Sequence, residues 1–301
     1  MAAQRVTTRR HFVEDYKRSQ LSLTDDLSLY LSQLIGRAKS VASNIFEGLH
    51  KRQKAGMGDV FWQYRLYSAG DDPNRIDWKR SGRADQIYIR ELQLQSPRNY
   101  YLWIDCAPSM AFSSSLAEQD KLSRAIMLAL ILAEILVRGG DRVALIGVMK
   151  PTQNRQIMDH LCYHIYEQII EKKSNPPSAK NLISKSHVIL LSDFLSDTTD
   201  LQSTLLTCSK QNCGGQVIMI SDPCEYKLPF NEESLFVATT EDSDYYAGNP
   251  QSLQTEYQNE YSKYCQQIKY AAQSASFSYL YHSTDQPISR AINKIIDHLY
   301  D

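Results

Sequence analysis

Short apolar runs alternate with longer helix-like stretches from residue 100 onward, and this alternation constrains the fold more than any other feature. The runs expected to form strands cover residues 100–105, 142–148, 187–192, 216–221 and 277–281, with one more at 234–239. The stretches expected to form helices cover residues 116–138, 155–172, 199–211, 255–274 and 287–299. Because parallel strands joined through helices form right-handed crossover units, the pattern predicts an α/β fold with a doubly wound, mostly parallel sheet.

The first of these strands ends in an acid. Its sequence, YYLWI, is an apolar run with aromatics, typical of a strand buried on both faces, and Asp105 follows it directly. A second acid, Asp193, follows the apolar run HVILLS. In open α/β sheets, ligands bind outside the carboxyl ends of the strands. We therefore expect both carboxylates at one edge of the sheet, where they mark the functional site.

Two interpretations of these acids are open. Carboxylates at neighbouring strand ends are the oxygen ligands that Mg²⁺ or Mn²⁺ prefers, and the hydroxyls of Ser109 and Ser192 can add to them. Alternatively, Asp105 and Asp193 each cap the turn or helix that follows. The first interpretation predicts a metal site, and the second predicts a purely structural role.

The helix expected after the first strand carries signals at both ends. Ser115, with Glu118 three residues later, predicts a capping box at its start. The pair Gly139-Gly140 predicts a left-handed stop at its end. Its body is apolar nearly all round, which predicts a central helix packed against the sheet.

The residues before the first parallel strand are expected to form an N-terminal part and a small β-rich unit. Apolar residues at helical spacing predict an amphipathic helix at 23–39, and a shorter helix follows at 42–46. Glycines punctuate two strand-like runs at 61–67 and 86–94, which predict an antiparallel pair. The expected parts are an N-terminal tail with helices at 1–47, a β-rich unit at 48–97 and the α/β domain at 98–301.

Composition excludes several classes of protein. The net charge of −1 gives no global field that would attract nucleic acid, so no nucleic-acid partner is expected. The longest apolar stretch, 125–137, is too short to span a bilayer, and no apolar segment follows the basic start as in a signal peptide. The six cysteines form no C-x-x-C pair and are expected to be reduced. These features predict a cytoplasmic protein without membrane insertion.

Several motifs of enzymes are missing from the sequence. There is no G-x-x-x-x-G-K-[ST] nucleotide loop, no G-x-G-x-x-G after a strand and no G-x-S-x-G nucleophile elbow. Asp105 as a nucleophile would need a second acid two residues later, and Ala107 stands there. The sequence therefore favours a protein that is not an enzyme.

One long motif resembles a known family. Residues 65–79 read RLYSAGDDPNRIDWK, and this closely matches the pattern R-x-Y-x-x-G-D-D-x-R-x-I-D-W of the bacterial domain-of-unknown-function-fifty-eight family, with one extra residue before Arg75. The resemblance extends from about residue 48 to the end of the sequence. In addition, DCAPSM at 105–110 resembles the D-x-S-x-S start of the metal-ion-dependent adhesion site in von Willebrand factor type A domains, and Ser192-Asp193-Phe194 resembles its later strand-end aspartate.

The resemblance implies a fold and a role. Members have a β-rich part followed by a type A α/β domain, and they commonly accompany MoxR-type AAA ATPases. The implied function is that of an adaptor, not a catalyst, which engages the ATPase or its client protein in protein maturation or complex assembly. A metal-dependent hydrolase that uses Asp105 and Asp193, and a purely structural scaffold, are the alternatives.

The resemblance also implies a metal site for Mg²⁺ or Mn²⁺. Asp105, Ser109 and Asp193 are the residues that match the type A pattern. Ala107 replaces the first serine of that pattern, and the segment 173–186 offers no threonine where the pattern has one. With fewer protein ligands, water has to complete the shell of the ion, so the expected site is weak.

The family motif itself has two interpretations. As a docking surface for a partner, it would use its charged residues and its tryptophan: Arg65, Asp71, Asp72, Arg75, Asp77 and Trp78. As a structural element, it is a turn in which arginine–aspartate pairs and a proline fix the backbone.

Overall fold

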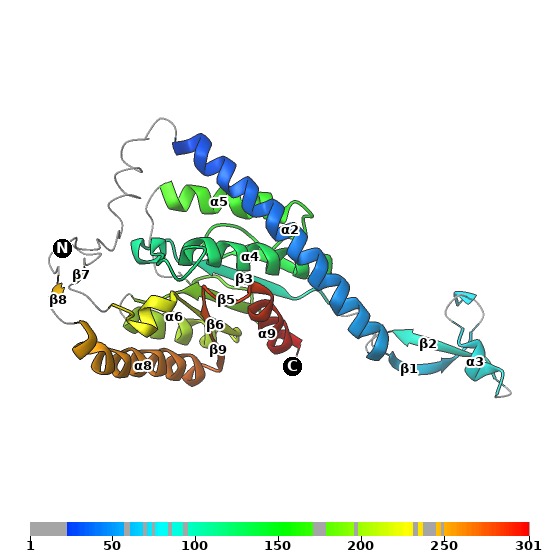
Figure 1. The fold of residues 1–301 in the computed structure, drawn as a ribbon. Helices are drawn as coiled ribbons and strands as arrows, with labels where there is room; N and C mark the ends of the chain where they lie inside the picture. Colours follow the sequence, from blue (N-terminus) through cyan, green and yellow to red (C-terminus); the bar gives the residue numbers. More distant parts are fainter. Residues whose placement is uncertain are drawn as a thin grey trace. The chain divides into compact units, whose positions relative to one another are not determined.

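A computed structural model describes residues 23–56, 61–68, 71–73, 76–83, 86–92, 96–170, 179–195, 198–230, 234–236, 245–247 and 250–300. The chain divides into two compact units (Figure 1). The larger unit comprises residues 1–42 and 98–301, and the smaller unit comprises residues 43–97.

The larger unit is built on a five-stranded parallel sheet with the order β4-β3-β5-β6-β9. Its strands are β3 Asn99–Ile104, β4 Arg142–Leu145, β5 His187–Ser192, β6 Gly214–Ser221 and β9 Phe277–Ser283. An antiparallel bridge between Val143 and Thr152 adds to the β4 edge. The predicted α/β class, with a doubly wound and mostly parallel sheet, is confirmed.

The order in which the chain adds strands to this all-parallel sheet reverses between β3 and β5. β3 is the first of the five strands in the chain, yet it lies between β4 and β5. The chain therefore adds β4 on one side of β3 and all later strands on the other. In open α/β sheets, a crevice forms at the carboxyl ends of the strands that flank such a reversal. The strand order thus places the binding edge at the ends of β3 and β5.

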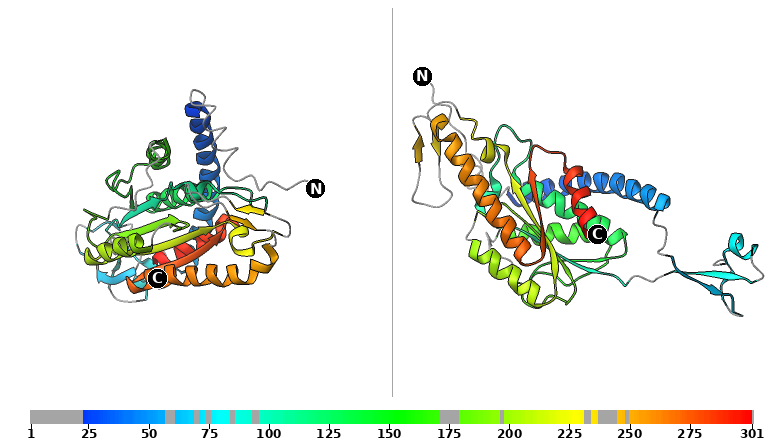
Figure 2. Two further views of the ribbon diagram at one scale, coloured as in Figure 1. Left: turned by 90° about the vertical axis from the view of Figure 1, so that its left-hand side faces the viewer. Right: turned by 90° about the horizontal axis from the view of Figure 1, so that it is seen from below.

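Helices cover both faces of the sheet. The long ones are α4 Lys121–Arg138, α5 Ile157–Ile170, α6 Thr198–Lys210, α8 Pro250–Ser274 and α9 Ile288–Tyr300. Figures 1 and 2 show α4 and α5 on one side of the sheet and α6 and α8 on the other. The α9 helix packs against α4. Two short helices, η2 Pro108–Ala111 and α7 Pro223–Lys227, lie in the connections.

The core has one layer on each side of the sheet because side chains alternate along a strand. Tyr101, Val188 and Val217 pack with α6 and α8. Residues one position along, such as Leu102 and Ile189, are fully buried on the opposite face. There α4 is buried along nearly its whole length, as its apolar sequence predicts.

The start of α4 differs from the prediction. The expected capping box of Ser115 and Glu118 is wrong, because the helix begins at Lys121. Asp120 is the N-cap, and its carboxylate accepts hydrogen bonds from the Ser123 backbone N–H at 2.6 Å and from the Ser123 hydroxyl at 2.7 Å. The stop at the other end lies where expected, with Gly140 in the left-handed region at φ +90°.

The N-terminal helix is longer than predicted. A single helix, α2 Leu23–Gly56, replaces the two helices expected at 23–39 and 42–46. The residues between those two segments include neither proline nor glycine, so nothing interrupts the backbone hydrogen bonds. Within the larger unit, Leu34 and Ala38 of this helix are buried, and Tyr30 shares a hydrogen bond with Ser123 of α4.

The smaller unit contains the predicted antiparallel pair. Strands β1 Phe61–Leu66 and β2 Tyr88–Leu92 pair with each other, and α3 Trp78–Ser81 lies between them in the chain. The strand expected at 234–239 does not join the main sheet. Its described part, β7 Ser234–Phe236, pairs with β8 Tyr245–Ala247 in a separate two-stranded sheet.

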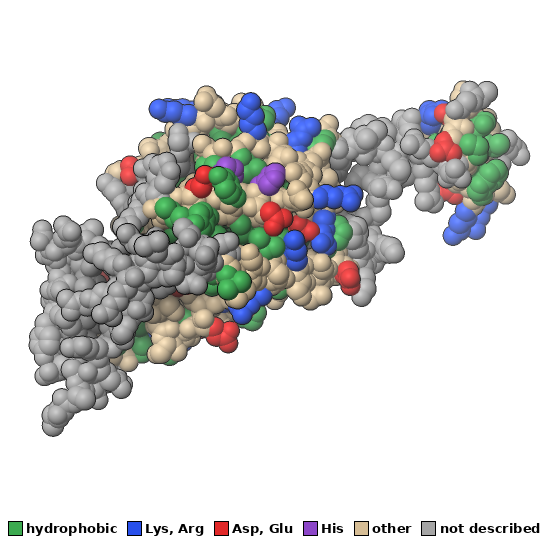
Figure 3. Space-filling view, turned by 90° about the horizontal axis from the view of Figure 1, so that it is seen from above, with side chains coloured by type: hydrophobic (Ala, Val, Ile, Leu, Met, Phe, Trp, Pro, Cys, Tyr) green, Lys and Arg blue, Asp and Glu red, His purple; other side chains and the backbone are tan. Residues whose placement is uncertain are grey.

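No helix among the described residues is both long enough and apolar enough to cross a lipid bilayer. On the face drawn in Figure 3, positive and negative side chains are interspersed.

Candidate functional site

Three acids lie at the carboxyl ends of neighbouring strands. Asp105 follows β3, Asp193 follows β5 and Asp222 follows β6. The Asp105 backbone N–H continues the ladder by donating to the Leu191 carbonyl at 3.0 Å, which fixes the registry of the first two strand ends. The two predicted acids thus lie side by side at the point where the strand order reverses. Both are buried, with exposed fractions of 4% for Asp105 and 1% for Asp193.

The Asp105 carboxylate is held by groups close to it. Its Oδ2 accepts a hydrogen bond from the Ser192 hydroxyl at 2.6 Å, and its Oδ1 accepts one from the Ala107 backbone N–H at 2.8 Å. The pKa of Asp105 lies above its ordinary value, chiefly because the carboxyl is buried. The nearby charge of Asp193 also raises this pKa, whereas the two hydrogen bonds and the charge of Lys121 lower it. Asp105 therefore ties β3 to β5 and also caps the turn after β3.

The Asp193 carboxylate is paired with a lysine that the sequence motifs do not point to. Nζ of Lys121, at the start of α4, lies 2.8 Å from Asp193 Oδ2 and also contacts Glu225 of α7. Burial by itself lowers the pKa of Lys121, but the charges of Asp193 and Glu225 outweigh it, and the pKa lies above its ordinary value. A buried and fully charged ammonium thus joins β5, α4 and α7.

The acid after β6 completes the network. Asp222 caps α7 in a capping box with Glu225, and it accepts hydrogen bonds from the backbone N–H and the hydroxyl of Ser114 at 2.9 and 2.5 Å. The Ser221 hydroxyl donates to Glu225 at 3.0 Å. Each strand-end acid therefore has partners from the chain itself.

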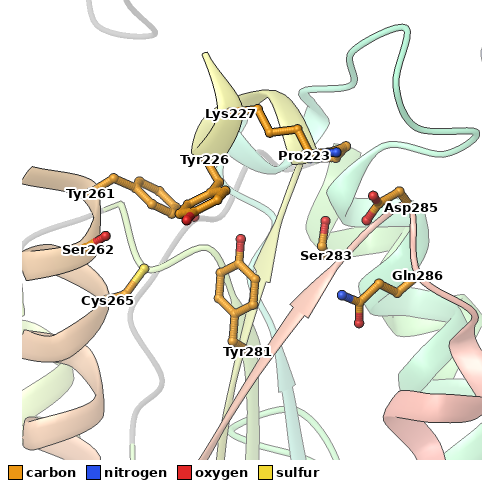
Figure 4. Close-up of a pocket in the computed structure, with 10 residues that line it drawn as sticks. All are labelled: Pro223, Tyr226, Lys227, Tyr261, Ser262, Cys265, Tyr281, Ser283, Asp285 and Gln286. Carbon is orange, nitrogen blue, oxygen red and sulfur yellow. The ribbon is translucent and has the colours of Figure 1, made fainter. Parts of the chain in front are cut away.

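A pocket of about 520 Å³ opens beside this network (Figure 4). Figure 4 shows the rings of Tyr226, Tyr261 and Tyr281 on one side and Ser283, Asp285 and Gln286 on the other. The pocket connects with the network through the Tyr261 hydroxyl, which donates to Ser221 at 2.6 Å. A half-aromatic, half-polar cavity of this size is typical of a site that takes a ligand or a side chain.

The family motif in the smaller unit is held mainly by its own contacts. The Arg65 guanidinium makes two hydrogen bonds of 2.9 Å to the Asp71 carboxylate, which also accepts from the Ser68 backbone N–H at 2.8 Å. Asp77 caps α3 by accepting from the Arg80 backbone N–H at 3.1 Å. These three predicted docking residues thus have structural contacts.

The other predicted docking residues differ from these three. Trp78 is 67% exposed, which is unusual for so large an apolar side chain. Asp72 is exposed as well. Arg75 lies outside the described residues.

The sequence model of the family described as "Protein of unknown function DUF58" matches residues 63–264, which is more than half of the chain. The chain belongs to the DUF58 family. The match confirms the family that the motif at 65–79 predicts, and it extends from the smaller unit through the sheet with the three strand-end acids.

Individual relatives are distant. Uncharacterized proteins of Mycobacterium bovis and Mycobacterium tuberculosis are 26% identical over 105 residues, which are 35% of this DUF58 chain and 32% of the relatives. The chain thus spans about a third of the length of the curated relatives it matches. An aerotolerance-related membrane protein from Bacteroides fragilis is 12% identical, with a TM-score of 0.40 over 67% of this chain and 99% of that one. BatB from Bacteroides thetaiotaomicron is 12% identical, with a TM-score of 0.38 over 67% and 98%.

The residues at the DUF58 sheet edge do not fit the metal that the type A resemblance implies. Both oxygens of Asp105 accept hydrogen bonds from the chain, and the Lys121 ammonium lies against Asp193. Ser109 lies in η2, in the turn that follows Asp105. Among the described residues, no group of three or more His, Cys, Asp or Glu side chains is arranged to hold a metal. The geometry fits the capping interpretation of the two acids, extended by an ion pair.

Signals for the missed residues are present in the DUF58 sequence. Ser221-Asp222 repeats the pattern of Ser192-Asp193, an apolar strand followed by serine and aspartate. Lys121 stands inside the apolar stretch predicted as a helix at 116–138, where a buried ammonium needs an opposite charge. A lysine at such a position indicates an acidic partner elsewhere in the chain, although the sequence does not say which one.

Proposed function

We propose that the protein is a non-catalytic adaptor that binds a MoxR-type AAA ATPase or its client in protein maturation or complex assembly. One observation carries the proposal: the strand-end acids have partners from the chain itself, while a tyrosine-lined pocket opens beside them. These contacts support a role for this edge of the sheet in binding, since ligands of open α/β folds bind outside the carboxyl ends of the strands.

The contacts of the acids argue against catalysis by them. A general base or nucleophile needs a carboxylate oxygen that can reach the substrate. Asp105 and Asp193 are buried, and their oxygens accept hydrogen bonds from Ser192, Ala107, Lys121 and Leu195. These contacts do not favour the alternative of a metal-dependent hydrolase, and we propose a non-catalytic role.

The pocket is the part of this site that a partner protein can enter. Tyrosines are enriched where interfaces gain most of their binding energy, because each combines a large apolar ring with a polar hydroxyl. Tyr226 is 49% exposed at the pocket and lies edge-to-face with Tyr261, 6.4 Å between ring centroids. A side chain of the partner would pack against these rings and bond to the polar side formed by Ser283 and Asp285.

The cysteines support a cytoplasmic location for this adaptor. All six are free thiols in the structure, four of them buried. Burial raises the pKa of Cys106, Cys162 and Cys208 to about 12, so these thiols are protonated and unreactive at neutral pH. Unpaired thiols are typical of a reducing compartment.

A pulldown with the cognate MoxR-type ATPase, with and without ATP, tests the proposal. Tyr226→Ala is expected to weaken binding roughly tenfold, because a central tyrosine often contributes more than about 1 kcal/mol. Tyr270→Ala is the matched control, since Tyr270 is 74% exposed on α8 and does not line the pocket. The proposal fails if the unmodified protein retains no more ATPase than an unrelated bait, or if both variants bind equally well.

A further inference from the structure

Lys121 is the most unusual residue of the site. Its side chain is completely buried, and the two acids that contact its ammonium are nearly so, with side-chain exposures of 2% for Asp193 and 16% for Glu225. It lies in the first turn of α4, where the positive end of the helix dipole opposes it. Since both burial and the dipole disfavour the ammonium, the two acids are the charged partners that offset this cost, and the ring of Phe112, 5.7 Å from Nζ, adds a cation–π contact.

We propose that the Lys121 ammonium, paired with Asp193, takes the place of a cation at this edge of the sheet, so that the folded protein binds no divalent metal at Asp105 and Asp193. The inference concerns the chemistry of this edge and does not depend on which partner the protein binds.

The contacts leave little space for a competing ion. A divalent cation at Asp193 would have to displace the ammonium, which is fully buried and would then lack a partner for its charge. Asp105 needs no cation, because Ser192 and Ala107 already bond to its oxygens. The structure thus supplies one positive charge at the position where a metal would otherwise compensate the carboxylates.

Removing the ammonium should create a metal site. In Lys121→Ala, the carboxylates of Asp193 and Glu225 would face an empty space, and carboxylate oxygens are the preferred ligands of hard cations. Ca²⁺ accepts oxygen ligands in a flexible arrangement, whereas Mg²⁺ needs near-ideal octahedral geometry. Ca²⁺ therefore fits the vacated position with less movement than Mg²⁺.

Calorimetric titration with Ca²⁺, Mg²⁺ and Mn²⁺ tests the inference. The unmodified protein is expected to bind none of these metals at Asp193, so its titration should look the same as that of Asp193→Asn. Lys121→Ala is expected to bind one Ca²⁺, at least tenfold more tightly than Mg²⁺, and to gain thermal stability from it. The double variant Lys121→Ala with Asp193→Asn should lose this binding. Lys263→Ala is the matched control, because Lys263 pairs with Glu260 on the surface and its loss should create no site.

Each outcome decides the inference. Binding of any of the three metals to the unmodified protein that disappears in Asp193→Asn overturns it, and so does a folded Lys121→Ala that binds no Ca²⁺. If Lys121→Ala does not fold in a chelator, recovery of its circular dichroism spectrum on adding Ca²⁺ supports the inference. If none of the three ions restores the spectrum, the inference is wrong, because the vacated position should accept a divalent cation.

Discussion

A lysine in the first turn of a helix lies at the end of the dipole that repels positive charge. Lys121 is nevertheless fully buried there, because Asp193 and Glu225 reach it from elements far away in the chain. Neutral donors, the Ser192 hydroxyl and the Ala107 backbone N–H, satisfy the carboxylate of Asp105. At the scale of single residues, both predicted acids are therefore bonded to groups of the chain, one to an ammonium and the other to neutral donors.

Loss of the central ammonium should be costly. Lys121→Met leaves two buried carboxylates without their cation and is expected to lower the free energy of unfolding by about 3–5 kcal/mol. Urea denaturation measures this change. Lys263→Met removes the partner of Glu260 from a pair at the surface and should cost less than about 1 kcal/mol. Equal losses in the two variants would show that the buried pairs contribute no more to the free energy of unfolding than a surface pair does.

A buried histidine makes stability depend on pH. Burial, helped by the charge of Arg124 and opposed by Asp285, lowers the pKa of His282 to about 4. The unfolded chain binds a proton at this residue near pH 6.5, so stability is highest above that pH and falls as the pH drops toward 4.

Between pH 7 and pH 5, the loss that His282 causes is expected to be about 2 kcal/mol. Denaturant midpoints measured across this range test the expectation, and His282→Gln should flatten the dependence. His160→Gln is the control, since His160 is exposed on α5. If His282→Gln leaves the pH dependence unchanged, the loss comes from other groups.

The elements owe their limits to local contacts as much as to periodicity. The α4 helix begins five residues later than its apolar pattern suggests, because Ser114 bonds to Asp222 and Asp120 takes the cap position. The α2 helix continues through the region between its two predicted segments because no residue breaks it. Periodicity identifies an element, and a cap or a breaker decides where it ends.

The cap of α4 can be tested directly. Asp120→Ala removes the acceptor for the Ser123 N–H and is expected to lower the free energy of unfolding by about 1 kcal/mol. Ser115→Ala, at the cap position that the sequence suggested, should lower the free energy of unfolding by only a small fraction of the effect of Asp120→Ala. Chemical denaturation of the two variants measures both effects. A larger effect of Ser115→Ala would indicate that the helix begins at Ser115, as the sequence predicted.

At the scale of the whole molecule, the match to the family covers parts of both compact units. The matched residues, 63–264, begin in the smaller unit and extend across most of the larger one. The smaller unit holds a motif tied together by Arg65 and Asp71, with Trp78 left exposed. The larger unit holds the lysine-centred acids and the tyrosine pocket. Each unit thus offers its own candidate contact for a partner.

The exposed tryptophan separates binding from stability. Trp78→Ala is expected to leave the thermal midpoint within about 2 °C, because an exposed side chain contributes little to folding. If the family motif docks a partner, the same variant should reduce retention of the MoxR-type ATPase by roughly tenfold. Tyr270→Ala serves as the control in this assay too. Unchanged retention would leave the motif with the structural role that its ion pair indicates.

Much of the fold follows from the sequence by itself. The alternation of apolar runs and helical stretches determines which segments become strands, and the main strands lie within a few residues of their predicted positions. The acids Asp105 and Asp193 could be placed at one edge, because parallel strands present their carboxyl ends on the same side. These properties are local, or follow from one repeated pattern, so they can be read from neighbouring residues.

Only the tertiary structure decided what those acids contact. Lys121 is 72 residues from Asp193 and 104 residues from Glu225 in the chain, and the sheet order brings the three together. A carboxylate at a strand end can serve a metal, a cap or an ammonium, and its own neighbours in sequence are the same in each case. The choice depends on which distant side chain reaches it, since charges buried together interact strongly whatever their separation along the chain.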